Sequence, residues 1–409
     1  MKLTICLITR SLPFHIRGGM ERHVEDLMNG LARIGHEVYV ITSKNPEGKR
    51  VLKFSDNITV FSVGSKIGKY SRRFFLESAT LFKALDSKIG IDLIHSQSIA
   101  GAGIVKYVNP ANTPVITTLH GTFLNDIRSM LYTKSLKSFL IATYLLGKRI
   151  FDLERYDRLL MKNSEKIIAV SNFLAEGIKQ EYPFISKEKI TIIYNGVDTE
   201  RFRPMKVSEQ LRDRFGINDE KVIFSIGRVE REKGFHLLIK TVKEISKKIP
   251  VKLIIGGEGT YLKYLKKLSI SEGIHQRIIF TGRIPDHELP IYYNLGDIVV
   301  FPTLRLEAFP IVLIEAMACG KPVIASKIGG TPEIIQNWKD GLLVEAGDIN
   351  DLKDKLQMVL HEEKLSKELS KMQEIKSLNT FRWIQCYKNI AVYNQTLQKN
   401  SSIFNCHTA

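Results

Sequence analysis

The stretch that decides the fold is Val299–Glu333, which reads VVFPTLRLEAFPIVLIEAMACGKPVIASKIGGTPE. Two short apolar runs within or beside it, 298–301 and 322–325, are typical of buried parallel strands. Pro310 introduces a helical run over 311–318 between them, because a proline at the start of a helix needs no N–H partner. A strand, a helix and a second strand in this order predict an open α/β sheet. Such sheets bind ligands at the carboxyl ends of their strands.

Two acidic residues stand in this unit, Glu307 in the loop before the helix and Glu315 within the helix. Ionised carboxylates only accept hydrogen bonds, which suits pairs of neighbouring hydroxyl groups. The spacing of the two acids, with Phe309 close behind the first, resembles the Glu-x7-Glu signature of retaining glycosyltransferases of family 4, which have the GT-B fold. The resemblance implies that Glu307 holds hydroxyls of the transferred sugar and that Glu315 holds the ribose of the nucleotide, with Phe309 also at the donor. For the spacing alone, the alternative is two unrelated acids beside a core helix.

The chain departs from this family at one place in the motif. Where the family usually has Gly-Phe-Gly after the first acid, this chain has Ala308-Phe309-Pro310. Pro310 has no backbone N–H, so one hydrogen-bond donor near the sugar or the phosphate is lost. The departure leaves the identity of the donor sugar open.

A second strand–turn–helix unit carries two cations. An apolar strand over 222–226 leads into GRVEREKG at 227–234 and then into a helix from Phe235. The free N–H groups at such a helix start favour an anion. Arg228 and Lys233 resemble the paired cations that hold the donor diphosphate in the family, Arg as a planar fork and Lys as a mobile point charge. The alternative is two solvated basic residues on a loop.

The first strand of the chain, over 3–9, is followed by a loop that ends in Gly18 and Gly19 and by a helix over 20–34. The glycines do not form a Gly-x-Gly-x-x-Gly fingerprint, so a nicotinamide site is not indicated. Gly18-Gly19 followed by Glu21 resembles the N-terminal loop of the same family. The resemblance implies that Gly19 lies near the donor diphosphate and that Gly18 and Glu21 lie on the acceptor side. The alternative is an ordinary glycine turn.

His120 directly follows an apolar strand over 115–119. A residue at the carboxyl tip of a parallel strand faces the crevice where ligands bind. In the family, a histidine at this place contacts the donor sugar near the reacting carbon. The alternative is a structural histidine that packs within the domain.

The alternation of strands and helices restarts in the second half of the chain. A length of 409 residues also exceeds one ordinary hydrophobic core. With the resemblance, this predicts the α/β GT-B fold, in which two Rossmann-like, doubly wound parallel-sheet domains face each other across a cleft. We expect a first domain over 1–198, a linker over 199–220 and a nucleotide-sugar domain over 221–375. A helix within 376–409 would return to the first domain.

The composition is that of a globular protein with a formal net charge of +17 at pH 7. Phosphorylated substrates, nucleic acid or anionic lipid would complement that charge, and no nucleic-acid motif accompanies it. A helix expected over 70–85 carries basic residues beside phenylalanines, which suits either a membrane interface or ordinary core packing. The start of the chain reads as a strand, not a signal peptide, and the longest apolar stretch, 138–147, is half of the about 20 residues that span a bilayer. Scattered cysteines fit a reducing cytoplasm.

These patterns predict a retaining glycosyltransferase, cytoplasmic or peripheral on the cytoplasmic membrane face, that uses a nucleotide-diphosphate sugar. The acceptor would be a glycan or lipid-linked hydroxyl in cell-surface glycan or glycolipid synthesis. We assign catalysis to His120, Arg228, Lys233 and Glu307 and expect no metal, no cofactor and no nucleic-acid partner. The resemblance implies a front-face route in which the leaving phosphate assists deprotonation of the acceptor. The alternatives are a GT-B epimerase, a non-catalytic sugar-nucleotide or lipid-binding module, and a tandem-Rossmann oxidoreductase, which lacks the fingerprint glycines.

Overall fold

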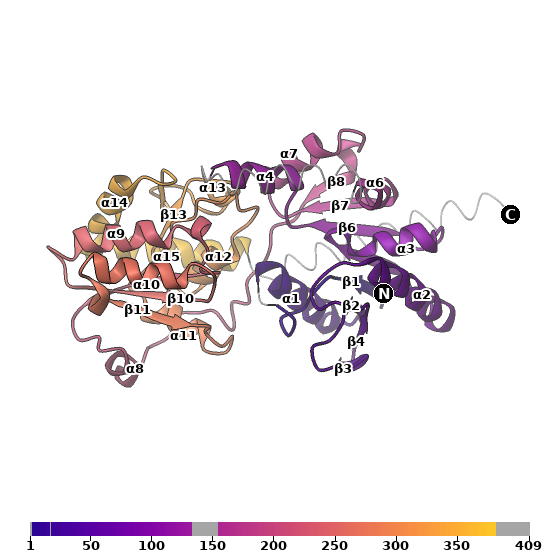
Figure 1. The fold of residues 1–409 in the computed structure, drawn as a ribbon, viewed down its shortest axis with the longest axis horizontal. Helices are drawn as coiled ribbons and strands as arrows, with labels where there is room; N and C mark the ends of the chain where they lie inside the picture. Colours follow the sequence, from indigo (N-terminus) through magenta and orange to yellow (C-terminus); the bar gives the residue numbers. More distant parts are fainter. Residues whose placement is uncertain (1, 17, 133–153, 382–409) are drawn as a thin grey trace. The chain divides into compact units, whose positions relative to one another are not determined.

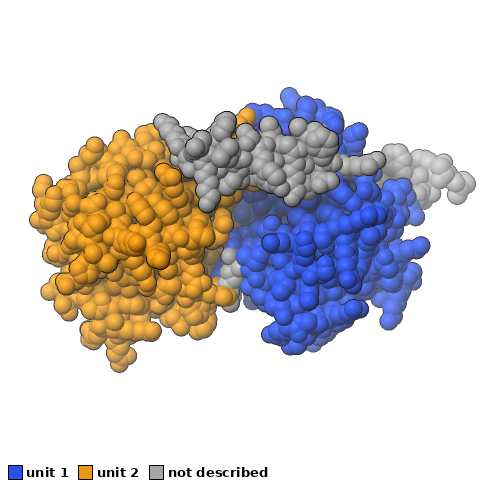
Figure 2. Space-filling view, viewed as in Figure 1, with its two compact units in different colours: residues 1–125, 136–196, 383–409 blue, residues 126–135, 197–382 orange. Residues whose placement is uncertain are grey.

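The computed structural model describes residues 2–16, 18–132 and 154–381 (Figure 1). The chain divides into two compact units, coloured separately in Figure 2. Unit 1 comprises Met1–Asn125, Leu136–Gly196 and Trp383–Ala409, and unit 2 comprises Asp126–Ser135 and Val197–Arg382. Each unit is an α/β structure built on its own sheet.

The sheet of unit 1 has eight strands in the order β3-β4-β2-β1-β5-β6-β7-β8, and only the β3–β4 pair is antiparallel within the described residues. The strands are β1 (Thr4–Ile8), β2 (Glu37–Ser43), β3 (Val51–Ser55), β4 (Ile58–Val63), β5 (Leu93–Gln97), β6 (Val115–Leu119), β7 (Lys166–Ala169) and β8 (Ile190–Ile192). Among the described residues of this half of the chain, the helices are α1 (Gly19–Arg33), α2 (Arg72–Ile89), α3 (Ala102–Tyr107), α4 (Phe123–Tyr132), α6 (Glu154–Asn163) and α7 (Asn172–Glu181).

The first helix follows its apolar spacing. Val24, Leu27, Met28 and Leu31 recur at helical intervals, and all four pack in one buried cluster with side chains of β1, β2 and β4. Burying this stripe fixes α1 against the sheet. The loop before it, which ends in Gly18, therefore lies directly after the carboxyl end of β1.

Helix α2 begins at Arg72, after Ser71, whose hydroxyl accepts a hydrogen bond from the backbone N–H of Phe74; it ends at Ile89 and is followed by Gly90, which has a φ of 68°. It is thus longer than the expected 70–85. Phe74, Phe75 and Phe82 are buried in unit 1. The three rings therefore serve core packing, the second of the two roles that the sequence left open for them.

The sheet of unit 2 is wholly parallel, with six strands in the order β11-β10-β9-β12-β13-β14. The strands are β9 (Lys221–Ile226), β10 (Val251–Gly256), β11 (Ile278–Gly282), β12 (Ile298–Phe301), β13 (Val323–Ser326) and β14 (Leu342–Val344). The helices are α8 (Glu209–Arg214), α9 (Phe235–Ile245), α10 (Leu262–Ser271), α11 (Leu289–Leu295), α12 (Ile311–Ala318), α13 (Thr331–Ile334), α14 (Ile349–His361) and α15 (Glu363–Thr380). A buried apolar cluster joins α9 and α14 to the strands.

Sheet order brings the two motifs of the second half together. Strands β9 and β12 are parallel neighbours, with Ile223 opposite Ile298 and Phe224 opposite Val299. The loop that follows β9 carries Lys233, and the loop that follows β12 carries Glu307. Because neighbouring parallel strands end at the same edge, the two loops lie side by side at the carboxyl edge of the sheet.

Several expected boundaries differ from the structure. Pro310 has a φ of −75° and a ψ of 100°, so it precedes α12 and is not its first helical residue. The expected linker, 199–220, contains α8 and belongs to unit 2. Helix α15 runs through position 376, the first residue of the range in which the C-terminal helix was expected. The rest of that C-terminal helix and the apolar stretch 138–147 lie outside the described residues.

Candidate functional site

Close contacts between backbone atoms hold the loops at the carboxyl edge of the sheet in unit 2. Gly257 has a φ of 119°, and a Cβ on it would lie 2.0 Å from the carbonyl oxygen of Gly227. A Cβ on Gly259 would lie 2.3 Å from the carbonyl oxygen of Val229. The loops after β9 and β10 therefore lie backbone on backbone, which only glycine allows at these positions. Glu230 adds a side-chain link, since its carboxylate accepts hydrogen bonds from the backbone N–H and hydroxyl of Thr260.

The loop after β9 also fixes Lys233. Its last turn ends at Gly234, which has a φ of 73° and lies so close to Pro302 that a Cβ would be 1.8 Å from the proline carbonyl oxygen. This contact holds Lys233 next to the end of β12. The Nζ atom of Lys233 lies 5.4 Å from the ring centroid of Phe301.

Lys233 and Glu307 form an ion pair, with 2.5 Å between Nζ and Oε1. The side chains are 13% and 20% exposed. Burial alone would raise the pKa of Glu307, but the charges of Lys233, Arg305 and Arg228 outweigh it, and the pKa lies below its ordinary value. Glu307 is therefore ionised at neutral pH. The structure thus joins directly two residues to which the sequence assigned separate partners, the diphosphate and the sugar.

A glycine turn holds the backbone of Glu307 in place. The N–H of Gly330 donates a hydrogen bond of 2.8 Å to the carbonyl oxygen of Glu307. A Cβ on Gly329, which has a φ of 60°, would lie 2.3 Å from the same oxygen. The Gly-Gly pair after β13 therefore braces the loop that presents the carboxylate.

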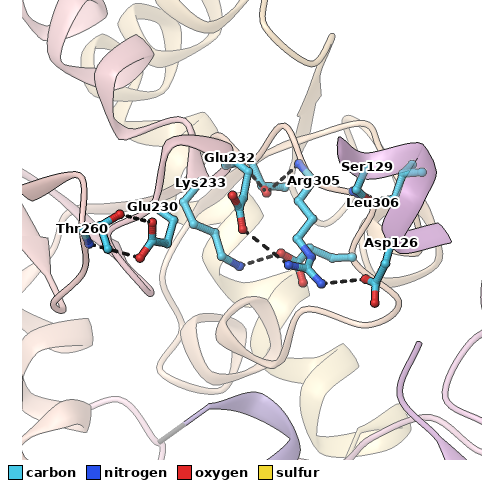
Figure 3. A network of polar contacts seen from close by, with 10 residues as sticks. Asp126, Ser129, Glu230, Glu232, Lys233, Thr260, Arg305 and Leu306 are labelled. Atoms are coloured by element: carbon cyan, nitrogen blue, oxygen red, sulfur yellow. Dashed lines mark hydrogen bonds and ion pairs between the residues drawn. The ribbon is translucent and has the colours of Figure 1, made fainter. Parts of the chain in front are cut away.

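Arg305 is a further cation of this loop that sequence reasoning missed (Figure 3). Its guanidinium contacts the carboxylate of Asp126 at 2.8 Å and that of Glu232 at 3.4 Å. The N–H of Leu306 donates to the Ser129 hydroxyl at 3.1 Å. Asp126 and Ser129 belong to the part of α4 that is included in unit 2. No motif marks Arg305; its position two residues before Glu307 is the only local signal.

The other predicted donor residues of unit 2 differ in their exposure. Glu315 is 3% exposed and accepts a 2.7 Å hydrogen bond from the hydroxyl of Tyr293, a residue that sequence reasoning also missed. The ring of Phe309 is buried and packs on Phe381, with 5.8 Å between centroids. Arg228 is exposed on the loop after β9. Of these three residues, Arg228 alone is exposed.

His120 lies in a cluster of histidines in unit 1. Its Nε2 atom is 2.8 Å from the side-chain oxygen of Gln97, and its ring meets that of His23 edge-on at 4.8 Å between centroids. Burial, reinforced by His23 and His95, holds the pKa of His120 well below its ordinary value. The ring is therefore neutral at physiological pH, with its proton on the nitrogen that faces the Gln97 oxygen. Sequence reasoning missed the other members of this cluster, although Gln97 ends the strand next to that of His120.

The loop at Gly18 is closed by Glu21. The carboxylate of Glu21 is buried, accepts a hydrogen bond from the Ser11 hydroxyl at 2.5 Å and lies 3.6 Å from the guanidinium of Arg10. A Cβ on Gly18 would lie 2.6 Å from the other carboxylate oxygen. Gly18 precedes α1 and Gly19 begins it. The partners of Glu21 thus lie in the loop itself, and their contacts hold that loop in place.

The described residues contain no cluster of histidine, cysteine and acidic side chains that is arranged to hold a metal ion. Across the same residues, no helix combines the length and the apolar composition needed to cross a membrane.

Two α/β units, each built on a predominantly parallel sheet, define the class of the protein. Sucrose-phosphate synthase from Thermosynechococcus elongatus shares the fold with a TM-score of 0.78 and 22% identity, covering 97% of this chain and all of that one. Anabaena HepE in complex with UDP and glucose gives a TM-score of 0.72 and 21% identity over 97% of this chain and 100% of that chain. These neighbours establish the GT-B fold.

The sequence matches narrow the class to a family. Residues 17–201 match Glycosyltransferase Family 4, and residues 207–375 match the glycosyl transferases group 1. An uncharacterized glycosyltransferase of Methanocaldococcus jannaschii is 29% identical over 359 residues, which cover 84% of this chain and 85% of that protein. The chain belongs to the group 1, family 4 glycosyltransferases, and the epimerase and binding-module alternatives are not favoured.

Proposed function

We propose that the protein transfers a sugar from a nucleotide-diphosphate sugar to a hydroxyl acceptor with retention of the anomeric configuration. The observation that carries this proposal is the ion pair of Lys233 and Glu307 at the loops that follow β9 and β12, together with the exposed Arg228, whose charge also acts on Glu307. Cations there suit a diphosphate, and a carboxylate suits sugar hydroxyls. The UDP and glucose bound by Anabaena HepE support the same class of donor.

In the proposed reaction, the bond between the anomeric carbon and the phosphate oxygen breaks, and the acceptor oxygen bonds to that carbon on the same face. The acceptor proton passes to the leaving phosphate oxygen. Arg228 and Lys233 stabilise the negative charge that grows on the phosphate, so no metal ion is required for that task. Glu307 orients the sugar, Glu315 holds the ribose, and neutral His120 contributes a hydrogen bond near the reacting carbon.

The acceptor we propose is a glycan or a lipid-linked glycan of the cell surface. The net charge of +17 supports reversible docking on an anionic membrane face where such acceptors are found. Because the rings of α2 are buried, we assign this docking to charge and not to insertion of those aromatic side chains.

The test has two parts. A thermal-shift panel of UDP, GDP, ADP and their sugars should find one nucleotide that stabilises the protein by about 2.7 kcal/mol at a hundredfold excess over Kd. Proton NMR of the fresh product should then show an α linkage from an α-linked donor, with turnover preserved in EDTA. A β anomeric proton would contradict retention, and activity that requires a divalent ion would contradict the role given to the two cations.

A further inference from the structure

The contact between Lys233 and Glu307 makes them partners of each other before any ligand binds. Their charged atoms lie 2.5 Å apart, and both side chains are mostly shielded from water. The backbone around them is closely packed, because Gly234 lies against Pro302 and Gly329 against Glu307 itself. The two groups are therefore held in register without a ligand.

A diphosphate at this edge would compete for the same ammonium group. The Glu307 carboxylate either gives up Lys233 or remains as a like charge beside the phosphate, and both cost binding free energy. A complete donor would compensate Glu307, because the hydroxyls of its sugar can donate to the carboxylate. A nucleoside diphosphate without the sugar offers no such donors.

We propose that Glu307 is an internal competitor for Lys233, which makes the site select the intact nucleotide-sugar over the nucleoside diphosphate product. This inference rests on the proposed function and adds a specificity role to it. After transfer, the sugar leaves with the acceptor and Glu307 loses its hydroxyl partners. Glu307 then returns to Lys233, and the diphosphate loses its cation and dissociates. One carboxylate thereby serves both sugar recognition and product release.

The experiment is calorimetry with UDP, GDP and ADP on the full chain, followed by the corresponding sugar nucleotide. Glu307→Gln removes the charge and keeps the size of the side chain. It should tighten binding of the nucleoside diphosphate by about three- to tenfold while weakening the sugar nucleotide relative to it. In the Lys233→Ala background the same substitution should give no gain, because the contested cation is absent.

Glu232→Gln is the matched control. It removes the same charge from the neighbour of Lys233, but its carboxylate contacts Arg305. A smaller gain with this variant than with Glu307→Gln supports direct competition, and an equal gain would show a general charge effect and overturn the proposal. Thermal unfolding confirms that each variant is folded.

The results that would contradict this inference differ from the results that would contradict the proposed function. If the wild type binds one nucleoside diphosphate and Glu307→Gln binds it no better, competition is excluded while the proposed function stands. If Glu307→Gln tightens diphosphate binding as much in the Lys233→Ala background as in the wild type, competition for Lys233 is also excluded. If the wild type binds none of the three diphosphates or their sugars, the proposed function fails and this inference fails with it.

Discussion

Replacing Tyr293 by phenylalanine should expose the importance of the buried contact that holds Glu315. The substitution deletes one hydroxyl, which donates a 2.7 Å hydrogen bond to Oε2 of the carboxylate. Tyr293 is fully buried and Glu315 is 3% exposed, so water cannot replace the lost donor. The aromatic contacts survive, because Phe202 and Phe224 meet the ring of Tyr293 edge-on and not its hydroxyl.

The size of the effect follows from the charge and the burial. A hydrogen bond to a charged group contributes about 1.5–3 kcal/mol. For a unit of about 200 residues, 1 kcal/mol changes Tm by roughly 2–4 °C, so the Tm of unit 2 should fall by about 3–12 °C. If Glu315 also binds the ribose, losing its orienting partner should weaken nucleoside diphosphate binding, by about three- to tenfold.

Thermal unfolding with and without nucleotide measures both effects. Tyr292→Phe is the matched control, since it removes the same atom from the adjacent buried tyrosine and leaves the Tyr293–Glu315 contact in place. Combining Tyr293→Phe with Glu315→Gln should give less than the sum of the single losses, because both remove one interaction. A Tm for Tyr293→Phe equal to that of Tyr292→Phe, or full additivity with Glu315→Gln, would refute the reasoning.

Lys233→Ala and Arg228→Ala should each weaken nucleoside diphosphate by about tenfold in calorimetry, and unchanged binding in both would contradict their assignment to the phosphate. Acid should destabilise unit 1, because burial lowers the pKa of His23 to about 4 and that of His95 to about 3. The stability they contribute is complete above their unfolded pKa of about 6.5 and falls as the pH drops below it, by about 2 kcal/mol per ring at pH 5, which urea unfolding at pH 7 and pH 5 would measure. A flat response between these pH values would contradict buried neutral rings. Co-sedimentation with liposomes should rise with anionic lipid and fall with salt, and equal weak binding to neutral and anionic vesicles would contradict charge-driven docking.

The elements nearest the decisive stretch were predictable because their signals are local. The apolar runs at 298–301 and 322–325 became β12 and β13 within one residue, and the helix over 311–318 is α12. The structure also explains glycines at Gly257 and Gly329, because each packs its backbone against another loop where a side chain would not fit.

Other parts carry no local signal. Strand β3 (Val51–Ser55) is an exposed edge strand without apolar alternation, so its pairing with β4 could not be foreseen. The pairing of Lys233 with Glu307 joins positions 74 residues apart, and it depends on β9 and β12 being neighbours in the sheet. The partners of the predicted residues, Gln97 and Tyr293, are likewise supplied by other elements, and nothing in their own surroundings singles them out.

The predicted site residues of the two units are therefore held by different kinds of interaction. In unit 2 the loops are held by close backbone contacts, and the opposite charges of Lys233 and Glu307 balance each other. In unit 1 His120 is surrounded by other imidazoles and an amide, and burial suppresses its charge instead of balancing it. A neutral histidine there can offer a hydrogen bond but cannot attract phosphate at neutral pH. In the function proposed above, attraction of the donor is therefore assigned to Lys233 and Arg228, and His120 is assigned a short-range, directional hydrogen bond.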